Sequence, residues 1–198
     1  MKKGLSITLG AIVGIIVILA FLFAGIYNKL IAAEEGVASA WAQVENVYQR
    51  RLDLVPNLVN VVKGYAAHER ETLQGVVNAR SRIGQMNVTS GIVNNPEMMA
   101  RFQEFQGELS SALSRLLVVV ERYPDLKASQ NFLALQAQLE GTENRISVER
   151  RRFNEAALFF NTQRRIFPNR IIAGMMGLKE KAYFKAEEAA SAAPTVTF

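Results

Sequence analysis

The feature that most constrains this chain is an uncharged run near its N-terminus. Residues Leu5–Ile26 are 22 consecutive residues without a charged side chain, and nearly all of them are apolar or glycine. As a helix rising ~1.5 Å per residue, the run would be ~33 Å long, close to the ~30 Å hydrocarbon core of a bilayer. A cleaved signal peptide is the alternative, but its apolar region would be only ~7–15 residues long. The sequence therefore favours an uncleaved membrane anchor.

The residues around this run predict its orientation and a possible self-contact. Lys2 and Lys3 precede the run and Lys29 follows it. Because basic residues gather on the cytoplasmic side of a span, we expect a cytoplasmic N-terminus and a single-pass anchor. Gly10 and Gly14 form a GxxxG pattern, which lets two membrane helices approach closely and makes these residues a candidate self-association site. Glycine is also common in membrane helices in general, so the alternative is that the pattern has no role in self-association.

The rest of the chain divides by composition. We expect a cytoplasmic N-terminus and anchor over residues 1–29, a helical domain over 30–185, and a flexible, small-residue tail over 186–198. Residues 30–198 hold 20 basic and 18 acidic residues, so much of the net charge of +5 comes from the anchor's flanks. Because no clustered basic excess remains, the sequence predicts no nucleic-acid partner.

Apolar residues at helical spacing predict the first long helix over residues 30–83. Its stripe advances mostly by three, four or seven residues, as one face of a helix requires, through Trp41, Val44, Tyr48, Val55, Leu58, Val62, Tyr65, Val76 and Ile83. Pro56 removes the hydrogen bond to the carbonyl of Leu52. A break there, with a new helix from Asp53, is the alternative, but the apolar phase continues across Pro56, so we predict one kinked helix.

Two further helices follow a loop over residues 84–96. In residues 97–123 apolar positions alternate by four and three from Met98 to Tyr123, and in residues 129–165 an apolar residue recurs every seven positions from Phe132 to Phe160 and on to Phe167. Residues 169–185 are expected to form a short fourth helical element or to meet a membrane surface. The predicted fold is all-α: an N-terminal transmembrane helix, then an elongated antiparallel bundle of three long helices plus that short fourth element.

The sequence offers no constellation for catalysis. His68-Glu69 begins like the zinc-protease HExxH motif, but Thr72 stands where the second histidine is needed. The chain has no cysteine and no glycine-rich phosphate loop. We therefore predict no catalytic, cofactor-binding or metal-binding residues, no cofactor, and a protein that is not an enzyme.

Polar residues recur on two of the predicted helices. Glu45-Asn46 precedes Arg50-Arg51, and Glu143-Asn144 precedes Arg150–Arg152. Three interpretations stand: charged pairs that fix the register between antiparallel helices, a solvated face, or a ligand site. Asn154 and Asn161, seven residues apart, should flank the apolar seam, where an asparagine can set the choice of partner.

Three blocks of this sequence resemble the LemA family of bacterial membrane proteins. They are AWAQVENVYQRRLDLVPNLVNVVKGYAAHERETL (40–73), YPDLKASQNFLALQAQLEGTENRI (123–146) and RRRFNEAALFFNTQRRIFP (150–168). The resemblance implies a single N-terminal membrane helix, an all-helical domain and no defined catalytic activity, and some members are linked to magnetosome membranes. It also implies structural or contact roles for Trp41, Asn46, Arg51, Asp53, Pro56, Asn57, Tyr123, Pro124, Asn131, Phe132, Glu143, Asn144, Arg151, Asn154, Asn161 and Phe167.

Taken together, these features predict a structural or scaffolding protein that acts through self-association at the membrane. The alternative is an adaptor that presents clients to a membrane protease or transporter, with residues 169–185 as its docking surface. The expected partners are the lipid bilayer, further copies of the chain and, in the adaptor alternative, another membrane protein. The expected location is the bacterial cytoplasmic (inner) membrane, with the helical domain on the periplasmic, extracytoplasmic side.

Overall fold

The computed structural model describes residues 2–86 and 91–185, with side chains from Leu9 onward; the predicted tail over 186–198 and part of the predicted 84–96 loop lie outside the described residues. The described part is helical and contains no strand. Its elements are α1 (Lys2–Tyr65), α2 (Arg70–Gln85), the 3-10 turn η1 (Ile92–Asn94), α3 (Pro96–Val120), α4 (Pro124–Lys127), α5 (Gln130–Arg165) and α6 (Asn169–Met175). The all-α prediction is confirmed.

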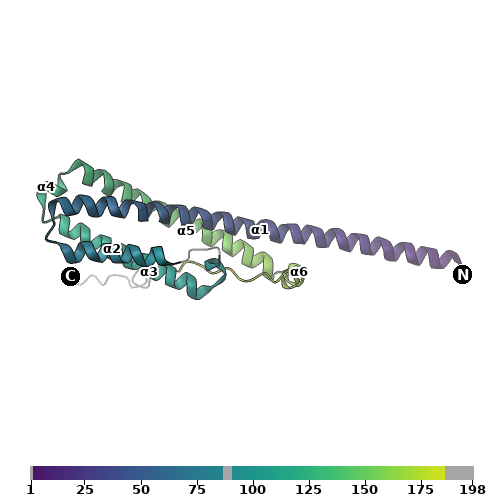
Figure 1. The fold of residues 1–198 in the computed structure, drawn as a ribbon. Coiled ribbons are helices and arrows are strands. Elements are labelled where there is room, and N and C mark those ends of the chain that lie inside the picture. The colour runs from purple at the N-terminus through teal and green to yellow at the C-terminus, as the bar shows by residue number, and fades with distance from the viewer. Residues whose placement is uncertain (1, 87–90, 186–198) are drawn as a thin grey trace, which may run out of the picture.

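The molecule is an elongated bundle built along one very long helix. α1 runs the length of the bundle and projects beyond it toward the N-terminus as a single rod (Figure 1). α5 returns antiparallel to α1 and makes the most extensive contact with it, while α2 and α3 pair with each other. The short α6 lies at the end of the bundle from which α1 projects (Figure 1).

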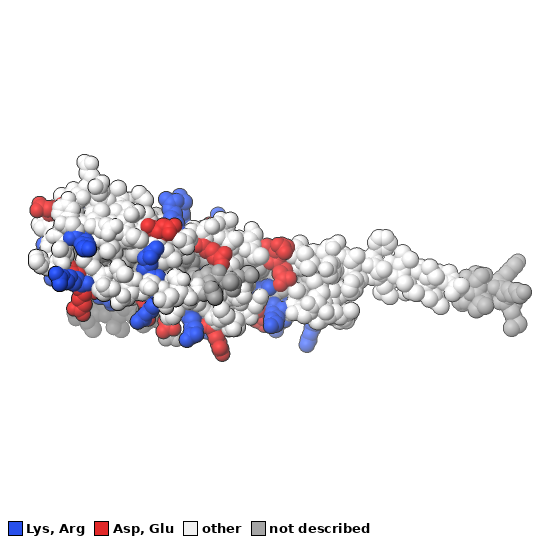
Figure 2. All heavy atoms as spheres, in the orientation of Figure 1, with Lys and Arg blue, Asp and Glu red and all other residues white. Residues whose placement is uncertain are grey.

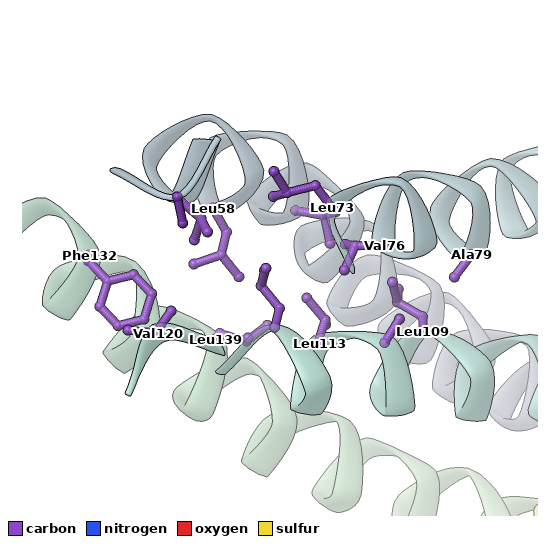
Figure 3. Close-up of a cluster of buried hydrophobic side chains, with 14 of the residues drawn as sticks. Leu58, Leu73, Val76, Ala79, Leu109, Leu113, Val120, Phe132 and Leu139 are labelled. Atoms are coloured by element: carbon purple, nitrogen blue, oxygen red, sulfur yellow. The ribbon is translucent and has the colours of Figure 1, made fainter. Parts of the chain in front are cut away.

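Three apolar clusters follow one another along α1. The far cluster joins α1, α2, α3 and α5, and Figure 3 shows Leu58, Leu73, Leu113 and Phe132 converging from these helices. A middle cluster contains most of the buried aromatic rings, and a small third cluster joins α1 to α6. Because α1 contributes to all three, its apolar stripe forms one side of the whole core.

The prediction of one kinked helix over residues 30–83 is wrong at its far end. The first helix stops at Tyr65, and after a turn over residues 66–69 the chain reverses as α2. Val62 before the turn and Val76 after it are both buried in the far cluster. α1 and α2 bury their apolar residues in the same core, so the apolar spacing continues unchanged in the sequence. The helix axis, however, is interrupted by the turn between them. Tyr65, assigned to the stripe, is 51% exposed.

The helix nevertheless continues through Pro56. A proline has no backbone N–H, so the carbonyl of Leu52 loses its helical hydrogen bond. In the structure the Nε–H of Arg80, on α2, donates to that carbonyl at 3.0 Å. A side chain from the neighbouring helix thus satisfies the acceptor that the proline leaves open.

The two later helices match their predicted stripes. On α3, Phe102, Leu109 and Leu116 are buried, and on α5 Phe132, Leu139, Ile146, Phe153 and Phe160 are buried. Phe167, the last position of the predicted repeat, is wrong as a core residue because α5 ends at Arg165, and its ring is 82% exposed.

One described helix is long and apolar enough to span a membrane, and it is the N-terminal part of α1. The apolar side chains from Leu9 to Phe23 on this part are 43–76% exposed. On the face seen in Figure 2, charged side chains gather on the bundle, and the described surface of the projecting rod carries none.

Replacing Arg80 by alanine should lower the free energy of unfolding by about 1–3 kcal/mol, because the partly buried carbonyl of Leu52 then lacks a donor. The measurement is urea unfolding of the full chain in detergent, followed by circular dichroism. In a Pro56→Ala background, residue 56 supplies the missing N–H, so the same Arg80→Ala change should be nearly neutral. Equal effects in both backgrounds would contradict this account of Arg80.

Candidate functional site

The most elaborate polar arrangement in the described chain holds an extended segment against the bundle. This segment, residues 178–185, is called the strap. It follows α6 through Gly177, whose φ of 68° lies in the left-handed region that glycine adopts without strain. From there the strap runs back along α5, antiparallel to it, as the yellow segment leaving α6 in Figure 1.

Two asparagines of α5 bind the strap backbone in the same way. The Asn161 side chain donates to the carbonyl of Lys181 and accepts from its N–H, both at 2.9 Å. The Asn154 side chain donates to the carbonyl of Phe184 and accepts from its N–H, also both at 2.9 Å. Each side-chain amide therefore pairs with the strap as a neighbouring strand would.

The spacing of the two asparagines suits this pairing. Seven helical residues at ~1.5 Å rise separate Asn154 from Asn161 by ~10.5 Å along the α5 axis. Three extended residues at ~3.4 Å separate Lys181 from Phe184 by ~10 Å. The helix and the strap thus present matching groups at the same interval. The sequence predicts that these asparagines, beside the apolar seam, determine which segment packs there. In the structure that segment is the chain's own strap.

Lys181 anchors the strap from its other side. Its side chain is 5% exposed, and the ammonium group donates to Glu34 Oε1 at 2.6 Å and to Asn94 Oδ1 at 2.8 Å and lies 4.9 Å from the centre of the Phe160 ring. A buried ammonium needs a countercharge and hydrogen-bond acceptors, and these contacts supply both. One strap residue therefore ties together α1, η1 and α5.

The strap also completes the aromatic cluster around Trp41. The Trp41 ring lies 5.4–6.0 Å from the rings of Phe102, Phe153 and Phe184, and Phe184 is a strap residue. The Arg150 guanidinium covers Phe184 at 4.8 Å from its ring centre. Aromatic rings at these separations contribute beyond their buried area. Without the strap, one side of this cluster would face solvent.

The Glu-Asn and arginine repeats supply an ion pair between helices, Arg51 with Glu143. Arg51 of α1 is buried, its Nε lies 2.9 Å from Glu143 Oε1 of α5, and its Nη2 donates to Ser110 of α3 at 2.6 Å. The contact fixes the relative positions of three helices. By contrast, Arg151 and Arg152 pair with glutamates on α5 itself, so the repeats are only partly a register device.

At the far end, Tyr123 and Glu69 join the turn after α1 to the corner before α4. The Tyr123 hydroxyl donates to Glu69 Oε1 at 3.1 Å, and Arg122 pairs with the same carboxylate at 3.2 Å. Partial burial and the nearby Glu69 carboxylate raise the pKa of Tyr123, so its hydroxyl stays protonated and able to donate.

The structure brings only some of the signature residues together. Trp41, Arg51, Tyr123, Phe132, Glu143, Asn154 and Asn161 take part in the contacts or core clusters described above. Pro56 is half-buried within α1, and the others are exposed: Asn46, Asp53, Asn57, Pro124, Asn131, Asn144, Arg151 and Phe167. His68 is exposed in the turn after α1. Within the described residues, no group of three or more histidine, aspartate or glutamate side chains forms a metal site.

Comparison with known proteins identifies the family. The LemA family model matches residues 40–198, which include the far part of α1, all later helices and the strap. The chain belongs to the LemA family. Among its relatives, protein LemA of Metamycoplasma hominis is 26% identical over 170 residues, covering 85% of this chain and 73% of the relative.

Two further LemA-like relatives carry a magnetosome name. Magnetosome protein MamQ of Magnetospirillum gryphiswaldense is 26% identical and MamQ 2 of Paramagnetospirillum magneticum is 25% identical, each over 187 residues that cover 86% of this chain and 68% of the relative. These likenesses extend over most of the helical architecture described above.

Replacing both Asn154 and Asn161 by alanine should release the strap, because four backbone hydrogen bonds are lost. We expect the amides of Lys181 and Phe184 to exchange with deuterium at least tenfold faster in the full chain. Asn144→Ala, an exposed asparagine of the same helix, is the matched control. Unchanged protection in the double variant would show that the asparagines do not hold the strap.

Replacing Glu143 by alanine should lower the free energy of unfolding by about 1–3 kcal/mol, because it removes the countercharge of a buried arginine. Glu155→Ala breaks an ion pair on the same helix in which both side chains are more than two-thirds exposed. Its effect should stay within about 0.5 kcal/mol. Chemical unfolding of both variants measures the difference, and equal effects would contradict the structural role of the Arg51–Glu143 pair.

Proposed function

We propose that this LemA-family protein is a membrane-anchored scaffold that assembles copies of itself side by side. The observation that carries the proposal is the uninterrupted course of α1. One helix extends from the apolar segment into all three clusters of the bundle, with no described break between them. Such a connection holds the bundle in a fixed position relative to its anchor, which a scaffold requires and a flexible tether does not provide.

The surface of the anchor segment supports self-association. A Cβ atom added at Gly10 or Gly14 would meet no atom within 4 Å, so this face of the rod is open. Two helices with small residues four apart can approach until their backbones are in contact. A second copy presents the same face and is therefore the natural partner in this proposal.

The charges that flank the span support the proposed placement. Lys2 and Lys3 precede it, against Lys29 after it, which favours a cytoplasmic N-terminus and a bundle on the extracytoplasmic side of the inner membrane. The proposal assigns no catalytic step to the protein.

The adaptor alternative has less support. It relied on residues 169–185 as a free apolar docking surface. In the structure Ile172, Ala173, Ala182 and Phe184 of this stretch are buried within the chain's own clusters. The large apolar side chains that remain exposed there are Ile171 and Met175.

The proposal is tested by measuring the mass of the full chain in mild detergent over a range of protein concentrations. We expect an oligomer that dissociates on dilution. Replacing both Gly10 and Gly14 by leucine should raise the dissociation constant of the oligomer by about tenfold or more, because bulky side chains keep the helices apart.

Ala20→Leu is the matched control, because residue 20 lies roughly 100° around the helix from the Gly10–Gly14 face. The dissociation constant of the Ala20→Leu oligomer should stay close to that of the wild type. A strictly monomeric wild-type chain at every concentration would overturn the proposal, and an equal effect of Ala20→Leu would remove the role of the two glycines.

A further inference from the structure

The end of the bundle nearest the rod lies at the level where the uncharged run stops. Ile172 and Ala173 of α6 pack against Leu30, and Ile26 and Met176 join the same cluster. Ile26 ends the apolar run Leu5–Ile26, and Lys29 is the next charged residue. Because Leu30 follows Ile26 by about one helical turn, α6 lies beside the point at which α1 would leave a bilayer (Figure 1).

This same end exposes large apolar side chains. Phe167 is 82% exposed, Met175 is 73% exposed and Ile171 is 57% exposed. They lie at the corner between α5 and α6 and on α6 itself, while Ile172 on the same short helix faces the cluster. On a surface that faces only water, three exposed large apolar side chains add no stability. At a lipid interface they can be buried among the lipid chains.

A groove with three arginines lies beside these apolar residues. It has a volume of ≈ 460 Å³ and is lined by Arg164, Arg165, Arg170, Ala173, Gly174 and Leu178. Arg164 is partly neutralised, because it pairs with Glu180 at 3.1 Å and donates to the carbonyl of Leu178 at 3.3 Å.

The other two arginines of the groove are available to a ligand. Arg165 and Arg170 are exposed, and no acidic side chain in the described residues lies within ion-pair distance of either. Guanidinium groups bind phosphate oxygens through paired N–H donors. The groove therefore combines cationic donors with the small or apolar lining residues Ala173, Gly174 and Leu178.

We propose that this groove binds the phosphate headgroup of an anionic phospholipid while Phe167, Ile171 and Met175 enter the adjoining lipid interface. The argument is the coincidence at one place of free cationic donors, an exposed apolar corner and the end of the membrane span. A free phosphate would use the arginines alone and leave the apolar corner unexplained. The inference rests on the proposed anchoring of α1 in a bilayer but not on self-association.

The depth of α6 relative to the bilayer tests the first half of the proposal. The chain has no cysteine, so single cysteines can carry a nitroxide label without a background signal. Ile16→Cys on the span, Met175→Cys on α6 and Leu133→Cys at the far end of α5 are labelled in full chains within nanodiscs. Collision with oxygen, which concentrates in lipid, is compared with collision with a water-soluble nickel chelate.

We expect the labels at residues 16 and 175 to favour oxygen and the label at residue 133 to favour the chelate. Leu133 is 49% exposed and therefore a matched apolar surface position. A water-exposed label at residue 16 would overturn the anchoring itself. A lipid-exposed label at 16 with a water-exposed label at 175 would overturn the present inference alone.

Lipid selectivity tests the second half. Full chains are taken from nanodiscs of mixed phosphatidylcholine and phosphatidylglycerol, and the lipids that remain bound are counted by native mass spectrometry. We expect phosphatidylglycerol to be preferred, and the Arg165→Gln, Arg170→Gln double variant to reduce that preference by about tenfold.

Arg101→Gln with Arg145→Gln, two exposed arginines on α3 and α5, is the matched control and should retain the preference. Equal loss in the control, or no preference in the wild type, would overturn the site. Inorganic phosphate at millimolar concentration should leave the lipid bound, because it cannot replace the apolar contacts. Complete displacement would assign the groove to free phosphate and overturn the lipid proposal.

Discussion

The continuity of α1 is the constraint on which the rest of this structure depends. Its buried residues, from Leu30 to Val62, form one side of every apolar cluster in the bundle. A proline in this helix would ordinarily leave the Leu52 carbonyl without a donor, and Arg80 replaces that donor from α2. The interaction links α1 to α2 near the far end of the bundle. The far four-helix packing and the alignment of α5 along α1 both follow from an unbroken first helix.

The strap shows how a mostly helical chain completes its own core. The middle cluster has a gap between α1, α3 and α5 that Phe184 fills, and two asparagines hold the strap backbone in place. An extended segment normally needs a strand beside it to satisfy its backbone groups. Here side-chain amides at a helical interval of seven replace that strand. The strap is thus an integral part of the bundle and not a loose end.

The sequence predicted what periodicity controls. The helices α3 and α5 and most of their buried residues follow from spacings of three, four and seven, whereas the candidate membrane segment follows from the length of the uncharged run. Periodicity does not reveal the turn at residues 66–69, because Val62 and Val76 remain in phase across it. Their spacing places Asn154 and Asn161 beside the seam but does not reveal their hydrogen-bond partner, since a bond to the backbone of a distant segment leaves no trace in side-chain spacing. The hydrogen bond from Arg80 to the Leu52 carbonyl is hidden from side-chain spacing for the same reason. The grouping of Arg164, Arg165 and Arg170 around a groove requires the fold of α6, which periodicity alone does not specify.

An unbroken helix from Ile26 to Tyr65 also has a mechanical consequence. At ~1.5 Å per residue it is a stiff arm of ~60 Å. When its apolar segment tilts in a bilayer by ~20°, the average for membrane helices, the far end near α4 moves sideways by ~20 Å. In the proposed anchored state, the packing and interfacial contacts that set the tilt of the helix would therefore also set the lateral reach of the outermost helices.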